Sequence, residues 1–136
     1  MTVKEHLQDI EIIDMFIASK KRERNEVLQD ATSISSALGK DGAGTGGVSD
    51  RVGNYVFKLC AIDEEIDRLV KDRERRIILI KSLDRPLEVK VLYKKYVEYA
   101  KYPSLSVIAD ELGYSHEHIR ETHSNALKKL KIPNCI

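Results

Sequence analysis

The spacing of apolar residues along the first 83 positions is the feature that most constrains the fold of this chain. Apolar side chains recur at spacings of three and four from Leu7 to Leu38, except for a polar interval at Lys20 and Arg24, and again from Val52 to Leu83, which is the period of an amphipathic helix. The alternation of a half-buried strand is absent from both stretches. We therefore predict two long helices, each about 45 Å long for roughly 30 residues.

A glycine-rich stretch, GKDGAGTGG at residues 39–47, separates the two periodic runs. Glycine does not sustain a helix, so we predict a loop over 39–49 at which the chain reverses, with Asp50 capping the second helix. An antiparallel pair would set residue i opposite residue 88 minus i, as a rough register. In that register basic side chains face acidic ones: Lys20, Lys21 and Arg24 face Glu64, Glu65 and Asp67, and Lys71, Arg73 and Arg75 face Glu11 and Asp14.

From Asp84 the helical units become shorter. Asp84 can cap a helix that has Pro86 in its first turn, turns Leu87, Val91, Leu92 and Tyr96 inward, and ends at Tyr102 and Pro103. Ser104 then caps a helix over 105–112 that Gly113 closes, and Ser115 caps a last helix that runs to about Leu130, before Pro133. The predicted fold is all-α: a long N-terminal antiparallel helical hairpin (1–84) followed by a C-terminal helix-turn-helix lobe (85–136).

The spacing of Ala109, Gly113 and Ile119 is the one that a helix-turn-helix requires. It provides a small residue at the helix crossing, a glycine in the turn and an apolar anchor under the second helix, and Ile108, Leu112 and Tyr114 complete the predicted core. The polar face of the last helix is then turned outward, toward a major groove if DNA is present. The candidate DNA-binding residues are Ser115, His116, Glu117, His118, Arg120, Glu121, Ser124, Lys128, Lys129 and Lys131.

The stretch from Val91 to Leu130 resembles the promoter-binding C-terminal domain, region 4, of bacterial sigma factors, in the segments VLYKKY, SLSVIADELGYS and HIRETHSNALKKLK. The whole chain is similar to phage and prophage transcriptional regulators of the ArpU/RinA type, through TSISSAL, LCAIDEEIDRLV, IKSLDRPLEVKVLYKKY and ELGYSHEHIRETHSNALKKL. That resemblance implies a sequence-specific double-stranded DNA-binding regulator, an activator of late or packaging genes.

Carried over from sigma factors, the resemblance implies that His116, Glu117, Arg120 and Glu121 contact base edges or nearby phosphates. This chain has His116, Glu121 and Thr122 where sigma factors usually have Arg, Gln and an apolar residue, so its DNA sequence should differ from a standard promoter element. Arg120 can contact guanine and Glu117 can accept from cytosine. Lys128, Lys129 and Lys131 suit phosphate contacts, although cations are also favoured at any helix C-terminus.

Charge is unevenly distributed along the chain. Residues 1–84 hold 14 Lys and Arg against 16 Asp and Glu, whereas residues 85–136 hold 9 against 6. A polyanion should therefore meet the C-terminal part. A lone two-helix hairpin buries little apolar surface, so we also expect a homo-oligomer, a dimer, formed through the N-terminal helices. Docking of these helices on RNA polymerase is the alternative.

Catalysis, a metal and a cofactor are not expected. Gly42, Gly44 and Gly47 satisfy G-x-G-x-x-G, but the preceding segment is helical, whereas a dinucleotide site needs a strand there. The histidines at 116, 118 and 123 are expected at the surface or in caps, since no further ligand completes a zinc site nearby. Cys60, beside the apolar stripe, is expected to pack rather than to act as a nucleophile.

No apolar run approaches the ~20 residues of a membrane span, and the start MTVKEHLQDIEII lacks the pattern of a signal peptide. With only two cysteines, we expect a cytoplasmic protein. Two other functions stay open. One is a phage terminase small subunit, which also joins a helix-turn-helix to an oligomerising helical segment. The other is a module that binds polymerase or a sigma factor and never touches DNA.

Overall fold

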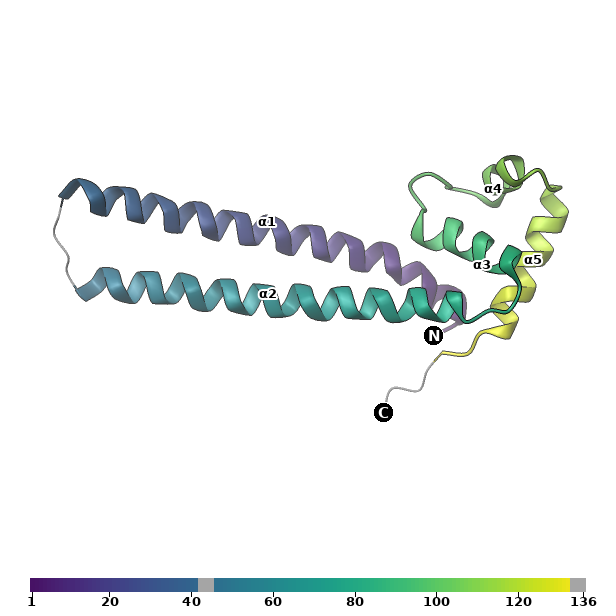
Figure 1. Cartoon of the computed structure of the whole chain (residues 1–136), viewed down its shortest axis with the longest axis horizontal. Coiled ribbons are helices and arrows are strands. Elements are labelled where there is room, and N and C mark those ends of the chain that lie inside the picture. The colour runs from purple at the N-terminus through teal and green to yellow at the C-terminus, as the bar shows by residue number, and fades with distance from the viewer. Residues whose placement is uncertain (42–45, 133–136) are drawn as a thin grey trace. The chain divides into compact units, whose positions relative to one another are not determined.

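The computed structural model describes the backbone of residues 1–41 and 46–132 and the side chains of residues 1–32 and 51–132. Throughout these residues the chain is all-helical, without a strand (Figure 1). The elements in chain order are α1 (Val3–Asp41), α2 (Gly46–Lys81), α3 (Pro86–Leu92), the π-helix η1 (Tyr93–Val97), α4 (Leu105–Leu112) and α5 (His116–Lys129).

The loop predicted over 39–49 does not extend over all of these residues. Helix α1 continues to Asp41 and α2 already begins at Gly46, so Asp50 lies inside α2 and does not cap it. Each glycine costs a helix only about 1 kcal/mol, and extending an existing long helix is easier than starting one. The centre of the glycine stretch, 42–45, and Pro133 lie outside the described residues.

The chain divides into two compact units, and α1 and α2 both run through them. The larger unit comprises Met1–Asp14 and Asp72–Ile136, and the smaller unit comprises Met15–Lys71. The predicted domain boundary at 84/85 thus falls inside the larger unit, which includes the first turns of α1 and the last turns of α2.

In the smaller unit, two ion pairs join α1 to α2. Lys20 Nζ lies 2.7 Å from Glu65 Oε2, and Arg24 Nε lies 2.7 Å from Asp63 Oδ1. Partner numbers fall on α2 as they rise on α1, so the helices are antiparallel here, within about three residues of the predicted register. All four side chains are partly exposed, and such pairs are worth only ~0–1 kcal/mol each, so they select register more than they stabilise.

In the larger unit, α1 and α2 are joined in the same sense. Arg73 Nε lies 2.6 Å from Asp14 Oδ1, and Arg76 contacts the carbonyl oxygen of His6 at 2.5 Å and Asp9 at 3.6 Å. Lys71, predicted to face α1, instead pairs with Asp67 on its own helix at 2.9 Å.

Two buried clusters form the core of the larger unit. The first brings together α1, α2, α3, η1 and α5 through Leu7, Ile10, Ile80, Leu92, Tyr96, Ala126 and Leu130. The second joins α3, α4 and α5 through Val91, Ile108, Ala109 and Ile119. Helix α5 contributes to both clusters, so it is held against the long helices as well as against α4.

The capping residues of α4 and α5 are those predicted from the sequence. Ser104 Oγ accepts from the N–H of Val107, Ser115 Oγ accepts from the N–H of His118, and Gly113 is left-handed with φ 77°. The start of α3 is different, because its N-cap is Arg85 without a side-chain cap, and regular α-helix ends at Leu92 rather than near Tyr102. The π-helical turn that follows widens the backbone just before the connection to α4.

Gly113 and Gly53 form a matched pair of glycines for a stability test. A Cβ would meet no atom within 4 Å at either position, but Gly113 has φ 77° while Gly53 lies within α2. We expect Gly113→Ala to lower the free energy of unfolding by about 1 kcal/mol, because a left-handed alanine is strained. Gly53→Ala should raise it by about 0.5–1 kcal/mol. Urea denaturation followed by circular dichroism measures both changes. If the two substitutions change the free energy of unfolding in the same direction, this assignment of the α4–α5 turn is contradicted.

Candidate nucleic-acid interface

Helix α5 has one buried face and one exposed face. Ile119 and Ala126 are fully buried and Leu130 nearly so, which fixes the rotation of the helix about its axis. The candidate residues predicted from the sequence all lie on the exposed side: Ser115, His116, Glu117, His118, Arg120, Glu121, Ser124, Lys128, Lys129 and Lys131. One continuous polar surface therefore runs along α5 and its cap.

Thr122 is a polar residue on the buried face of α5. Its hydroxyl donates to the carbonyl oxygen of His118 at 2.8 Å, so the polar group is satisfied by its own helix. A threonine at this position is therefore compatible with the buried face of α5.

His123 is a core residue and not the surface or capping residue that we expected. It is buried, and its Nε2 lies 2.7 Å from the Tyr96 hydroxyl, with the two rings stacked 5.7 Å apart. Burial, together with the nearby charges of Lys4 and Lys95, lowers the pKa of His123 to about 4. Burial also raises the pKa of Tyr96 to about 12, so both partners are neutral at physiological pH.

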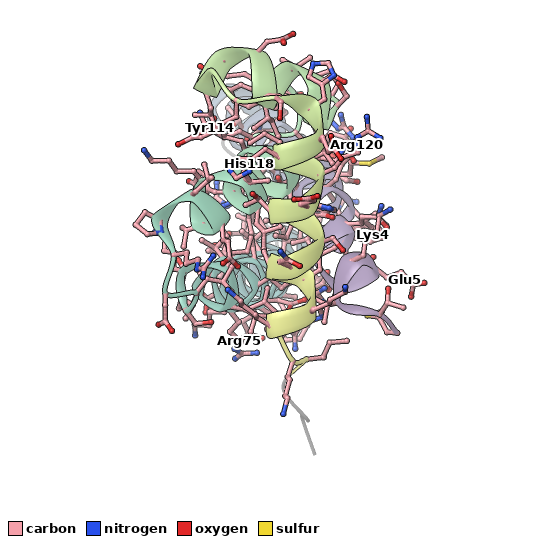
Figure 2. The ribbon with its side chains drawn as sticks, turned by 90° about the vertical axis from the view of Figure 1, so that its right-hand side faces the viewer. Lys4, Glu5, Arg75, Tyr114, His118 and Arg120 are labelled. Atoms are coloured by element: carbon pink, nitrogen blue, oxygen red, sulfur yellow. The ribbon has the colours of Figure 1, made fainter. Side chains whose placement is uncertain are left out.

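Two side-chain contacts stabilise the turn between α4 and α5. His116 Nε2 lies 3.3 Å from Asp110 Oδ1 on α4, and the rings of Tyr114 and His118 stack at 5.1 Å (Figure 2). Tyr114 is 46% exposed, so the expectation that it completes the core was wrong. It covers the start of α5 at the surface instead.

The lysines at the end of α5 differ in their surroundings. Lys129 Nζ lies 2.5 Å from Oε1 of Glu88, a carboxylate that is only 3% exposed. The other carboxylate oxygen, Oε2, is buried and has no hydrogen-bond partner among the described residues. Lys129 therefore neutralises a buried charge, whereas Lys128 forms no salt bridge within the described part of the chain. Of the two, Lys128 is the better candidate for a phosphate contact.

A groove beside α5 was not anticipated from the sequence. It encloses about 340 Å³ and is lined by Lys4, Lys95, Ser104, Leu105, Ser106, His116, Arg120 and His123. Figure 2 shows Arg120 and Lys4 on one side of α5, with Tyr114 and His118 on the other. We name this site the basic groove. No sequence signal marks it, because Lys4 and Arg120 are far apart in the chain and meet only in the folded unit.

Within the described residues, no group of three or more His, Cys, Asp and Glu side chains is arranged to hold a metal ion. None of the helices in this part of the chain is long and apolar enough to cross a membrane. Cys60 is exposed and not packed as predicted. No family model matches the chain, and comparisons with curated proteins and with solved structures find no significant match.

The buried His123 predicts a pH-dependent stability. Because its folded pKa of about 4 is below the ordinary value of 6.5, the unfolded chain binds a proton that the folded chain excludes. The contribution of His123 to the free energy of unfolding is complete above pH 6.5 and is lost as pH falls toward 4. Between pH 7.5 and pH 5, the free energy of unfolding of the wild type should fall by about 2 kcal/mol more than that of His123→Gln. Urea denaturation at the two pH values measures both.

The comparison with His123→Gln is needed because burial and Arg76 also lower the pKa of His6. His6 should give both proteins the same residual pH dependence. Equal pH profiles for the wild type and His123→Gln would show that His123 is not kept neutral by the fold.

The Glu88–Lys129 pair predicts that Lys129 and Lys128 have separable effects on stability. Lys129→Ala leaves the buried Glu88 carboxylate with only the exposed Arg85, whose Nε lies 3.8 Å from Oε1, and should lower the free energy of unfolding by about 2 kcal/mol. The matched change Lys128→Ala should stay within about 0.5 kcal/mol of wild type. Adding Glu88→Gln to Lys129→Ala should recover part of the loss in thermal or urea denaturation, since the charge is then gone. A Lys129→Ala protein as stable as Lys128→Ala would refute the structural role of this pair.

Proposed function

We propose that this protein is a sequence-specific double-stranded DNA-binding transcriptional regulator that inserts α5 into the major groove. The observation that carries the proposal is the division of α5 into a fully buried face, including Ile119 and Ala126, and a continuous exposed polar face. A helix held this way can enter a groove about 12 Å wide without exposing its core. The mechanism is positioning on DNA.

The residues on the exposed face have different roles in this proposal. Arg120 contacts guanine and Glu117 accepts from a cytosine amino group, each worth ~1–3 kcal/mol of discrimination. Lys128 contacts a phosphate, which holds the protein in place without reading sequence. His116 is turned toward Asp110, at 3.3 Å, and so supports the turn more than it contacts a base.

The biological setting rests on the resemblances found in the sequence. Similarity to sigma region 4 and to ArpU/RinA-type regulators supports a phage or prophage activator of late or packaging genes. The N-terminal helices would dimerise, placing two copies of α5 on half-sites about one helical turn apart, or dock on RNA polymerase. Exposed apolar side chains in the smaller unit, Met15, Phe16, Val56 and Phe57, support self-association.

A second candidate function is a protein-binding module that does not bind DNA. The observation in its favour is the pair of acidic side chains, Glu117 and Glu121, on the exposed face of α5. Neither of them forms a salt bridge within the described residues. Near phosphates these carboxylates are repelled unless each accepts a hydrogen bond from a base, whereas a basic protein surface would attract them.

Selection of bound duplexes from a random pool at physiological salt separates these two functions. An enriched sequence supports the regulator, and its symmetry reports whether a dimer binds. Arg120→Ala should relax the preference at one or two base pairs, while Lys128→Ala should weaken all duplexes alike and make the salt dependence less steep by about one phosphate. Because Lys128→Ala is expected to leave stability close to that of wild type, it is the matched control for Arg120→Ala.

Failure to retain any duplex in a salt-sensitive manner would overturn the DNA-binding proposal and favour the protein-binding module. If duplexes are retained but Arg120→Ala and Lys128→Ala change binding identically, the division between base contact and phosphate contact is wrong.

A further inference from the structure

The basic groove is lined by residues from both the N-terminal segment, predicted to serve oligomerisation, and the C-terminal segment, predicted to bind DNA. Lys4 belongs to the first turn of α1 and Lys95 to η1, whereas Arg120 projects from the candidate recognition helix α5. All three belong to the larger unit. The start of the helix predicted to serve oligomerisation therefore lies at the flank of α5 (Figure 2).

The position of Lys4 is set by the N-terminal cap of α1. The Glu5 N–H donates to Thr2 Oγ1 at 3.2 Å, and the Thr2 N–H donates to Glu5 Oε2 at 3.3 Å. This reciprocal pair is a capping box. It engages the Glu5 carboxylate with the backbone, while Lys4 forms no salt bridge within the described residues.

Lys95 is oriented by a contact that leaves its charge uncompensated. Its Nζ donates to the carbonyl oxygen of Pro103 at 3.2 Å, just before the cap of α4. An ammonium group has two further protons to donate. No carboxylate lines the groove. Burial is the main cause of the lowered pKa of His123, and the charges of Lys4 and Lys95 lower this pKa further, which agrees with a positive potential there.

The rim of the groove adds neutral donors at the start of α4. Ser104 caps this helix, and its hydroxyl oxygen accepts from the Val107 N–H, so its own proton is available to a ligand. Ser106 lines the groove as well. Two ammonium groups and two hydroxyls, with no acid among the lining residues, suit the oxygens of a phosphate.

We propose that the basic groove binds a backbone phosphate of duplex DNA, so that the first turn of α1 is part of the DNA interface. This inference rests on the proposed function, because it assigns the groove beside α5 to the strand that flanks the major groove. The open groove, of about 340 Å³, suits a phosphodiester that passes along it, and Arg120 stands between the groove and the exposed face of α5. Lys4 and Lys95 hold position and carry no sequence information.

The test compares two double variants of the full chain. Lys4→Gln with Lys95→Gln removes two charges from the groove, and glutamine at 95 keeps a donor for Pro103. Lys81→Gln with Lys90→Gln removes two exposed charges that do not line the groove. Circular dichroism melts establish that both proteins fold, and binding to the selected duplex is measured from 0.05 to 0.5 M salt.

We expect the groove variant to bind about 30-fold more weakly at 0.15 M salt, or about five-fold per lost contact. Because one phosphate is lost from the interface, the slope of log affinity against log salt should be less steep by about 1, with unchanged ranking of duplex sequences. The Lys81/Lys90 control should stay near wild type. If the wild type binds the duplex and both double variants bind equally well, the groove inference fails alone. If the wild type binds no duplex, the proposed function fails first.

A free phosphate ion is the other source of the same chemistry. Competition of inorganic phosphate and chloride at equal ionic strength distinguishes it. A phosphodiester site should show stronger displacement of duplex by phosphate than by chloride, and this difference should disappear in Lys4→Gln with Lys95→Gln. Binding of phosphate that needs Lys4 and Lys95 but does not displace the duplex would assign the groove to a small anion and overturn the inference.

Discussion

The contact of α5 with the two long helices is the constraint on which the larger unit depends. Leu7 and Ile10 from α1 and Ile80 from α2 share one buried cluster with Ala126 and Leu130 from α5. Helices α3, α4 and α5 alone are short and would bury little apolar surface, so a separate lobe of that size would be marginally stable. The ends of the long helices supply the missing surface. The exposed face of α5 is thus oriented by residues from the other end of the chain.

Two polar contacts, one buried and one partly buried, join α5 to its neighbours and restrict its rotation. His123 lies 2.7 Å from the Tyr96 hydroxyl of η1, and Lys129 lies 2.5 Å from Glu88 of α3. A buried polar group without its partner costs more than it gains when paired, so each contact disfavours any rotation that breaks it. Apolar packing alone would tolerate small rotations. The two contacts therefore specify which residues of α5 point outward.

Features set by neighbouring residues could be predicted from the sequence. The caps at Ser104 and Ser115 and the left-handed Gly113 depend on a few adjacent positions, and the helical period of 3.6 marks the buried face of α5. Opposed charges also indicated the antiparallel register. Other features depend on competition or on distant contacts. Helix propagation outweighed the glycines of the loop, and the burial of His123 required knowledge of Tyr96 and of the start of α1.

The candidate site shows the same limit. Every residue predicted on the exposed face of α5 is exposed, because the period alone determines that face. The basic groove could not be foreseen, since Lys4 lies in the segment with the acidic balance and its place beside Arg120 follows from the buried cluster. The net charge of a sequence segment is therefore a poor guide to surface potential in a unit built from both ends of a chain.

The distribution of charge around α5 separates affinity from specificity in the proposed complex. The exposed face carries Glu117 and Glu121 beside Arg120, while the other cations stand at its edges, in the basic groove and at Lys128. Attraction to phosphates from the edges falls with salt and is the same for every sequence. Carboxylates facing the bases oppose binding wherever no amino group meets them, so they penalise wrong sequences more than they strengthen the right one. A recognition helix of this kind would bind DNA weakly on its own and needs the flanking cations to hold it in the groove.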